Sequence, residues 1–299
     1  MLSLIDNVER LDRKEFIKHL REHGFSLKEY CIKYYARKDL LTGEDIEYKD
    51  DIHYVNSCFN SRDNMVKHFL AGDKLEDIKK TILGRAAIKS LKFAPSTVEA
   101  RTSIFPSPAL LVKLGIDYNA LNESLGLKPR YDYKPVIDKV ADPLHILVDT
   151  REQNPLQLSC KTSVAKLDVG DYSCQNHFNN CFVERKSLED FCGTMSQGFD
   201  RFKLEVERAQ SLGFHLAVLV EEKLETVTQI NVANNHKFIK GPPEFYLARM
   251  RSLCETYGNI QFLFVGGRYE SSKILQELFR IKGGFSRLDL QFLYDTRHI

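Results

Sequence analysis

Three short stretches decide the fold of the second half of this chain: ILVDTREQNPL (Ile146–Leu156), VGDY (Val169–Tyr172) and FVERKSLEDF (Phe182–Phe191). The first and the third begin with apolar, β-rich residues and end at turn-forming residues, a pattern that is typical of buried strands. An acidic residue stands at the end of each apolar run or in the adjoining turn, namely Asp149, Asp171 and Glu184. The stretches therefore predict strands that carry carboxylates toward a common region.

The same alternation extends outward from these stretches. The first strand is expected at His145–Thr150, and two further apolar runs lie at His215–Glu222 and Ile260–Gly267. Helical spacing of apolar residues predicts helices at Ser187–Cys192, Phe199–Leu212, Pro243–Tyr257 and Glu270–Phe279. Strands that alternate with helices indicate an α/β fold in which helices cover both faces of a sheet.

The ERK triplet carries a prediction about chemistry. Side chains two residues apart on a strand point to the same face, so Glu184 and Lys186 should project together and Arg185 should point the other way. A carboxylate beside an ammonium, with Asp171 upstream, suits metal-assisted hydrolysis of phosphodiesters, because carboxylate oxygens bind Mg²⁺ or Mn²⁺. The lysine would position the water or stabilise the oxyanion. On spacing alone, an ordinary surface ion pair remains an alternative interpretation of the triplet.

Together the three stretches resemble the nuclease domain of the XPF family, whose pattern is V-D-x-R-E, then G-D-Y, then E-R-K-x-x-x-D. Every position of that pattern is present and in order: Asp149, Arg151, Glu152, Gly170, Asp171, Glu184, Arg185, Lys186 and Asp190. A weaker resemblance continues through GFDRFKLEVERA, where Arg201 matches a basic residue of the family. The resemblance covers roughly residues 144–279, about half of the chain.

The resemblance implies a restriction-endonuclease-like α/β domain over residues 144–299, with a mixed central sheet and flanking helices. It implies that Mg²⁺ or Mn²⁺ is held by Asp149, Asp171 and Glu184, and that Lys186 orients the attacking water. The charged cluster around the scissile phosphate would be completed by Arg151, Glu152, Arg185 and Asp190. No Walker A pattern occurs, so no nucleotide cofactor is expected, and the chain leaves no room for the paired helix-hairpin-helix modules of many relatives.

Residues 1–126 show helical spacing, including two short helices at Ala109–Leu114 and Tyr118–Leu125, and predict a mainly α-helical domain. Basic residues outnumber acids from Thr81 to Arg130, and with Arg201 they are the predicted DNA-binding residues: Arg85, Lys89, Lys92, Arg101, Lys113, Lys128 and Arg130. A purely structural helical domain is the alternative. The segment Leu127–Pro143 holds three prolines and no apolar period, so we expect a linker there.

Composition excludes several classes of protein. The chain is 43% hydrophobic and 28% charged, as in ordinary globular proteins, and it has no apolar run long enough to span a membrane and no signal-peptide pattern. We therefore expect a cytoplasmic, DNA-associated protein without membrane contact. The net charge is only +2, so any basic surface must be local. Seven cysteines without CxxC spacing indicate reduced thiols rather than zinc ligands or disulfides.

The leading hypothesis is a Mg²⁺-dependent DNA endonuclease whose first domain selects the substrate, such as branched or flap DNA in repair or recombination. A sequence-specific restriction-like or homing-like endonuclease is the alternative within the class, and a non-catalytic DNA-binding subunit is the alternative outside it. The intact acids and lysine argue against the inactive subunit. A homodimer is expected. Many of the apolar residues late in the domain should pack against the sheet, and the surplus, together with Phe292–Tyr294, would form the dimer patch; these residues are Phe245, Leu247, Met250, Leu253, Tyr257, Ile274, Leu275, Leu278 and Phe279.

Overall fold

The computed structural model describes residues 93–102, 107–113, 116–124, 126–133, 137–141, 143–175, 180–228, 239 and 241–299. The chain divides into two compact units, one formed by 1–92 with 100–127 and the other by 93–99 with 128–299. The predicted DNA-binding residues Arg85, Lys89 and Lys92, like the predicted helices of the first 92 positions, lie outside the described residues.

The described part of the first unit contains α8 (Pro108–Lys113) and α9 (Tyr118–Ser124), which confirms the two short helices predicted there. Gly126 follows α9 with a φ of +78°, a left-handed conformation that glycine adopts readily at the end of a helix. The helix α7 (Thr97–Arg101) precedes both; it was not predicted, because its apolar residues are too few to show a period.

A six-stranded mixed sheet forms the centre of the second unit, with the strand order β2-β1-β3-β4-β5-β6. The strands are β1 (His145–Asp149), β2 (Lys161–Ala165), β3 (Tyr172–Cys174), β4 (Cys181–Lys186), β5 (His215–Val220) and β6 (Ile260–Phe264). β3 runs antiparallel to both of its neighbours and all other pairs are parallel. The mixed sheet is therefore confirmed. The sequence did not show β2, which is mostly exposed, or β3, which is only three residues long.

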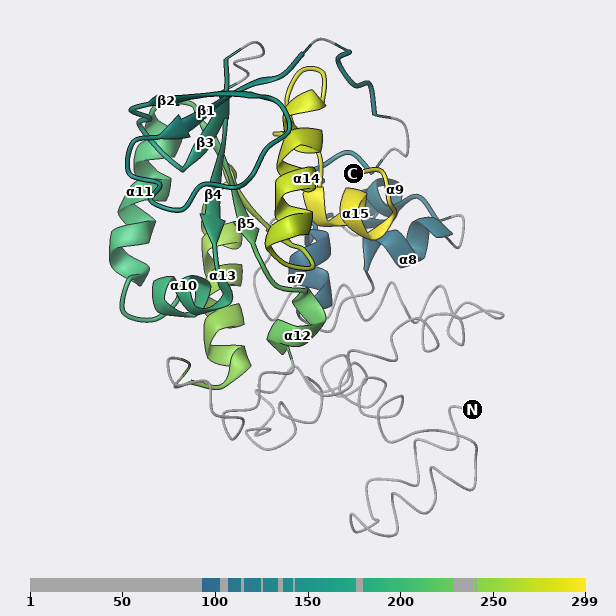
Figure 1. The fold of residues 1–299 in the computed structure, drawn as a ribbon. Helices are drawn as coiled ribbons and strands as arrows, with labels where there is room; N and C mark the ends of the chain where they lie inside the picture. Colours follow the sequence, from purple (N-terminus) through teal and green to yellow (C-terminus); the bar gives the residue numbers. More distant parts are fainter. Residues whose placement is uncertain are drawn as a thin grey trace, which may run out of the picture. The chain divides into compact units, whose positions relative to one another are not determined.

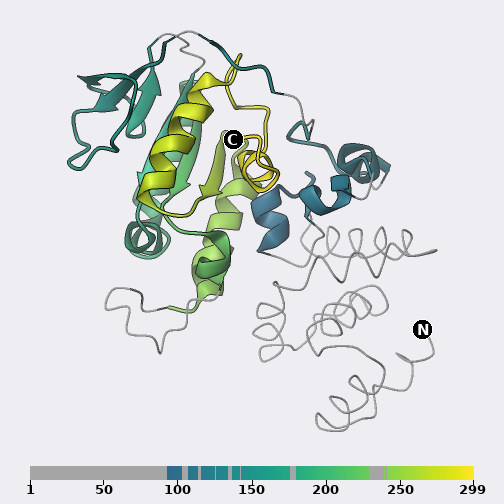
Figure 2. The same cartoon turned by 45° about the vertical axis from the view of Figure 1, so that its right-hand side comes forward.

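Helices cover both faces of this sheet (Figure 1). On one face, α10 (Leu188–Thr194), α11 (Phe199–Ser211) and α13 (Pro243–Thr256) share one core, in which Phe191, Val206 and Met250 pack with Val218 and Phe262. On the other face, α14 (Arg268–Arg280) crosses in front of the strands (Figure 2). The short helices α12 (Leu224–Thr228) and α15 (Leu290–Asp295) complete the unit.

The late apolar residues from which we expected a dimer surface belong to this core. All of them except Phe245 and Tyr294 are at most 8% exposed, whereas Phe245 is 40% exposed. Side chains that already pack against the sheet and its helices cannot also form an intermolecular patch. The core packing expected for most of these residues is therefore confirmed, the surplus expected to form a dimer patch is reduced to Phe245 and Tyr294, and dimerisation itself stays a prediction.

Of the segment expected to be a linker, Leu127–Pro143, the described residues from Lys128 onward are instead part of the second unit. Tyr131 and Tyr133 are 4% and 9% exposed. The ring of Tyr133 meets Phe292 edge to face at 5.2 Å between centroids. The amide of Asp132 donates to the carbonyl oxygen of Arg287 at 2.7 Å. The prolines hide any period in the sequence, yet the aromatic residues between them still pack, so the segment is no free linker.

Cys160, Cys174, Cys181, Cys192 and Cys254, the cysteines that the structure describes, are free thiols, as predicted. None of the helices that the structure describes combines the length and apolar character that a membrane crossing requires.

Candidate active site

The three predicted acids lie on, or directly before, three adjacent strands of the sheet. Asp149 ends β1, Asp171 directly precedes β3, and Glu184 lies in β4. The amide of Asp149 donates to the carbonyl oxygen of Asp171 at 2.8 Å, and the amide of Asp171 donates to the carbonyl oxygen of Val183 at 2.9 Å. The short antiparallel strand β3 therefore carries Asp171 between the other two acids, although it was not visible in the sequence.

Asp171 and Glu184 form a pair of carboxylates with unfavourable surroundings for two negative charges. Asp171 Oδ2 accepts a hydrogen bond from the backbone N–H of Arg185 at 2.8 Å. Burial, followed by repulsion from Glu184, raises the pKa of Asp171 to about 7. Burial also raises the pKa of Glu184, and the charge of Lys186 opposes that rise. A divalent cation between such oxygens would remove the repulsion, so the pair fits a hard cation.

Lys186 is held against Glu184, as the two-residue period predicted. Its Nζ donates to Glu184 Oε1 at 2.8 Å, and the two side chains are 10% and 15% exposed. The same Nζ lies 5.1 Å from the centroid of the Phe202 ring in α11, where the ring face attracts a cation. This contact places Glu184 and Lys186 on the α11 face of the sheet.

Arg185 projects to the opposite face, also as predicted. Its Nε and Nη2 donate to the two carboxylate oxygens of Glu152 at 3.1 Å each, and its Nη1 donates to Glu221 at 3.2 Å. A guanidinium paired with two carboxylates is fixed in place. Glu152 and Arg185 therefore support each other behind the strand instead of standing beside Glu184.

The carboxylate of Asp149 already accepts hydrogen bonds on both oxygens. Its Oδ1 accepts from the backbone N–H and the Nε of Arg151, and its Oδ2 accepts from the backbone N–H of Leu167 at 2.6 Å. Burial alone would raise the pKa of Asp149, but these hydrogen bonds outweigh it and lower the pKa. Asp149 thus fastens the turn after β1, while the Arg151 side chain stays 59% exposed.

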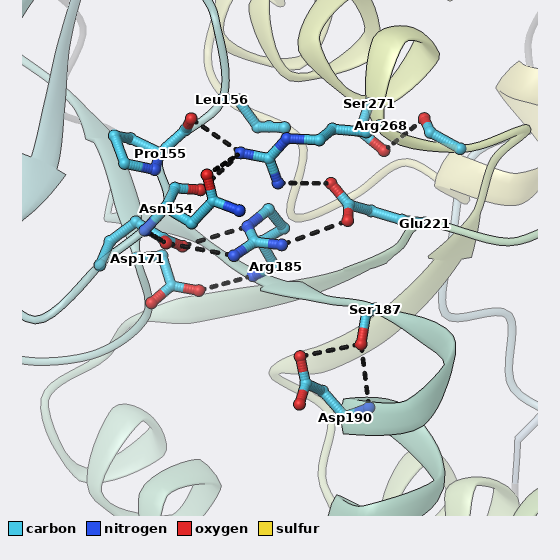
Figure 3. Close-up of polar contacts among 12 residues, drawn as sticks. Asn154, Pro155, Leu156, Asp171, Arg185, Ser187, Asp190, Glu221, Arg268 and Ser271 are labelled. Carbon is cyan, nitrogen blue, oxygen red and sulfur yellow. Dashed lines mark hydrogen bonds and ion pairs between the residues drawn. The ribbon is translucent and has the colours of Figure 1, made fainter. Parts of the chain in front are cut away.

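Asp190 contacts the N-cap residue of α10. Ser187 is the N-cap of α10, and its Oγ accepts from the backbone N–H of Asp190 at 3.1 Å. The same hydroxyl donates to Asp190 Oδ2 at 2.9 Å, so the carboxylate holds the N-cap side chain in place. Figure 3 shows this pair apart from the group of Arg185, Glu221 and Arg268. These two contacts with Ser187 account for Asp190 within its own helix.

Sequence reasoning missed Glu205 of α11. Its Oε1 lies 3.4 Å from the backbone nitrogen of Gly170, and its charge acts on both Glu184 and Arg151. It stands three residues after the buried Phe202, on the side of α11 that meets the sheet. An acidic residue on an otherwise apolar helix face is a signal that could have found it. Even so, no three His, Cys, Asp or Glu side chains of the described residues are already grouped to hold a metal ion.

The predicted DNA-binding residues do not behave alike. Arg201 is exposed on α11, Arg101 ends α7 and Lys113 ends α8, while Lys128 forms a β-bridge with Phe93. Arg130 departs from the expectation, because its side chain is only 10% exposed and its Nη2 donates to Glu99 Oε1 at 2.6 Å. Another of its nitrogens donates to the carbonyl oxygen of Cys254. Arg130 is thus a buried structural cation and is not available to phosphate.

Most of the second unit matches a known domain family. A family model, the ERCC4 domain, matches residues 148–278. The solved structure of XPF from Aeropyrum pernix in complex with DNA is similar with a TM-score of 0.36 and 20% identity, over 46% of this chain and 64% of that one. A second structure of XPF from Aeropyrum pernix gives a TM-score of 0.34 and 19% identity, over 52% and 69% of the two chains. The first of these two matches thus spans less than two thirds of the archaeal chain. A comparison with curated proteins finds no match. The second half of this chain therefore carries an ERCC4 domain, the XPF-type nuclease domain that its motifs resemble.

Proposed function

We propose that this protein is a metal-dependent endonuclease that hydrolyses phosphodiester bonds in DNA. The observation that carries the proposal is the convergence of Asp171, Glu184 and Lys186, all intact, within the matched ERCC4 domain. A non-catalytic subunit has no need of two carboxylates held close together at a cost in charge repulsion. An arrangement that is costly without a ligand is typical of a site at which chemistry occurs.

The cation would be held by Asp171 and Glu184, with Mg²⁺ or Mn²⁺ as the ions that suit carboxylate oxygens. When bound, such a cation activates water and neutralises charge that builds on the phosphate. Lys186 is fixed between Glu184 and the ring of Phe202, so its ammonium is placed to orient the attacking water or to stabilise the oxyanion.

The remaining motif residues take supporting roles in this proposal. Asp149 keeps the turn after β1 in shape and holds Arg151 by two hydrogen bonds. The exposed guanidinium of Arg151 is then the group best placed to contact the phosphate backbone. Glu152 and Arg185 hold each other in place, and Asp190 holds Ser187, the N-cap of α10. Asp149 was predicted as a third metal ligand; its hydrogen bonds favour a positioning role instead.

The test is cleavage of matched linear, flap, fork and four-way DNAs with Mg²⁺, with Mn²⁺ and with EDTA. Glu184→Gln and Lys186→Met should each lower cleavage by about a hundredfold or more, the usual effect of removing one group that stabilises a transition state. Lys203→Ala, which removes an exposed lysine of α11, is the matched control and should cut normally.

Two results would count against the proposal in different ways. Undiminished cutting by Glu184→Gln would show that the assigned site is not where the bond breaks. Tight DNA binding by the unaltered protein without cleavage of any substrate would favour the non-catalytic subunit.

A further inference from the structure

Arg268 ties α14 to the loop that follows β1. It is the first residue of α14, and its Nη2 donates to the carbonyl oxygens of Asn154 and Pro155 at 2.6 and 2.8 Å (Figure 3). The same nitrogen lies 3.1 Å from the side-chain oxygen of Asn154. One side chain thus holds two successive carbonyl groups that come more than a hundred positions earlier in the chain.

Glu221, which directly follows β5, joins this arginine to the motif. Its Oε1 pairs with Arg268 at 3.4 Å, its Oε2 accepts from Arg185 at 3.2 Å, and its side chain is 10% exposed. With Glu152 at the far end, the four residues form a row of alternating charges: Glu152, Arg185, Glu221 and Arg268. Each inner member has an oppositely charged neighbour on both sides, which a charge in this half-buried position requires.

The row reaches the candidate active site through two backbone contacts. The N–H of Arg185 donates to Asp171, so the place of Arg185 sets where that carboxylate lies. At the end of the same loop, the N–H of Leu156 donates to the hydroxyl of Tyr172 at 2.8 Å, and Tyr172 is the neighbour of Asp171 in sequence. Displacement of the loop after β1 would therefore shift Asp171 through both contacts, the one from Arg185 and the one through Tyr172.

We propose that Glu221 and Arg268 are positioning residues for DNA cleavage, because they fix Arg185 and the Glu152-bearing loop and thereby fix Asp171. This inference rests on the proposed function. Neither residue belongs to the XPF-type motif, and the row lies on the face of β4 away from Glu184 and Lys186, so neither is placed to touch the reacting atoms. Their removal should slow the chemical step and leave the affinity for DNA nearly unchanged.

The experiment compares Arg268→Ala, Arg268→Lys and Glu221→Gln with the unaltered full-length protein in single-turnover cleavage and in DNA binding with Ca²⁺ in place of Mg²⁺. Arg268→Ala should cut at least about tenfold more slowly, with a Kd for DNA within about threefold, since a small displacement of a catalytic group costs this much or more. The cleavage rate of Arg268→Lys should lie between those of Arg268→Ala and the unaltered protein, because one ammonium can pair with Glu221 but cannot also reach both carbonyl groups. Lys273→Ala removes a cation five residues further along α14 and should cut normally.

A second measurement does not depend on cleavage. Amide hydrogen exchange of residues 152–157 should quicken in Arg268→Ala and in Glu221→Gln, and should stay unchanged in Lys273→Ala. The double variant Glu221→Gln with Arg268→Ala should cut no more slowly than the worse single variant, because members of one row do not act additively.

The outcomes separate the inference from the function on which it rests. An unchanged rate and unchanged exchange in Arg268→Ala overturn the inference, and so does an effect confined to DNA affinity, which would make Arg268 a direct phosphate contact. If the unaltered protein cuts no DNA at all, the proposed function fails, and unchanged exchange in the loop would then overturn the positioning role separately. If Arg268→Ala does not fold, Glu221→Gln and Arg268→Lys carry the test.

Discussion

At the scale of single residues, some charged side chains of the candidate site are stabilised by hydrogen bonds and ion pairs, whereas the ionised form of Asp171 is on balance disfavoured. Asp149 is fixed by Arg151 and two backbone amides, and Arg185 is fixed by two carboxylates. Asp171, in contrast, has a pKa raised to about 7 by burial and by Glu184. The unfavourable free energy is therefore concentrated on the two carboxylates that we propose as metal ligands, which is where binding of a cation would recover it.

The first prediction concerns Asp171→Asn in the metal-free protein. A raised pKa means that ionisation of the folded protein costs free energy, so the contribution of Asp171 to stability is favourable at low pH and is lost as pH rises through about 7. The variant should therefore be more stable than the unaltered protein at pH 8, by on the order of 2 kcal/mol in the free energy of unfolding. This difference in stability should become smaller as pH falls from 7 toward 4. Urea unfolding in EDTA measures it. Asp138→Asn, an exposed aspartate, is the control, and a destabilised Asp171→Asn at pH 8 would contradict the prediction.

The second prediction concerns metal binding and pH. A protonated carboxyl group is a poor ligand, so Mg²⁺ or Mn²⁺ should bind more weakly as pH falls through about 7, where Asp171 takes up its proton. Either ion should raise the melting temperature at pH 8 by more than it does at pH 6, since a ligand stabilises the state that binds it. The melting temperature of Asp171→Asn should rise far less at pH 8. An equal rise in both proteins would place the cation elsewhere.

At the scale of elements, the site depends on the turn that begins β3. Gly170 has a φ of +67°, and a Cβ added there would come 3.0 Å from the carbonyl oxygen of Val183 and 3.3 Å from a methyl carbon of Leu216. Glycine is required here for two independent reasons, a left-handed backbone and close approach to β4. The next residue is Asp171, so the same turn that closes the sheet also aims the carboxylate.

The third prediction compares two glycines with the same backbone conformation. Gly213 has a φ of +72° and open space around the added Cβ. Gly213→Ala should cost about 1 kcal/mol of the free energy of unfolding, the usual penalty for a left-handed alanine. Gly170→Ala should cost roughly 1–3 kcal/mol more, because β4 must also give way. Thermal or urea unfolding of both variants tests the difference, and equal losses would show that crowding at Gly170 is relieved elsewhere.

How far the sequence predicts this domain can be judged from particular elements. β1, β4, β5 and β6 and the helices α10, α11, α13 and α14 follow from local period, and so do the opposite faces of Lys186 and Arg185. β3 is too short to show a period, and the exposed, polar edge strand β2 shows no apolar one. Glu205, Glu221 and Arg268 were missed for another reason. Their partners lie 35 to 114 positions away, and the pairing of distant charges leaves no local pattern.

At the scale of the whole molecule, the division of the chain differs from the one expected at Leu127. Phe93–Glu99 lies with residues 128–299, and Glu99 pairs with Arg130, which belongs to the segment that was expected to be a linker. The amide of Thr97 also donates to Asp289 at 2.6 Å. The second unit is therefore assembled from two separated pieces of chain, and a cut inside either piece would remove part of its packing.

The fourth prediction follows from that assembly. A fragment of residues 140–299 lacks Tyr131, Tyr133 and the Arg130–Glu99 pair, so it should unfold at markedly lower urea concentration than a fragment of residues 93–299. The loss should be several kcal/mol, since two buried aromatic side chains each contribute about 3 kcal/mol or more. Circular dichroism of both fragments during urea unfolding measures it. Equal urea midpoints of unfolding for the two fragments would show that Leu127–Pro143 acts as a linker after all.

The last prediction concerns what selects the DNA. Contacts to phosphate and metal carry no base information, so the candidate active site alone cannot choose a sequence or a junction. Residues 1–92 carry the predicted DNA-binding residues Arg85, Lys89 and Lys92, and a fragment that begins at Phe93 removes them without entering the second unit. We expect this fragment to cut weakly and to have lost the preference of the full chain among linear, flap, fork and four-way DNAs.

The three basic residues can be tested in the full chain as well. Their replacement by glutamine should weaken DNA binding and flatten its salt dependence, by roughly one unit of slope for each phosphate that the protein no longer neutralises. The matched control is replacement of Lys203, Lys223 and Lys273, three lysines of the second unit, which removes the same charge from elsewhere. If the fragment from Phe93 cuts the same substrates at the same positions with the same preference, the first 92 residues do not select the DNA substrate. Selectivity would then have to reside in the ERCC4 domain itself, with the exposed Arg151 and Arg201 as the first residues to replace.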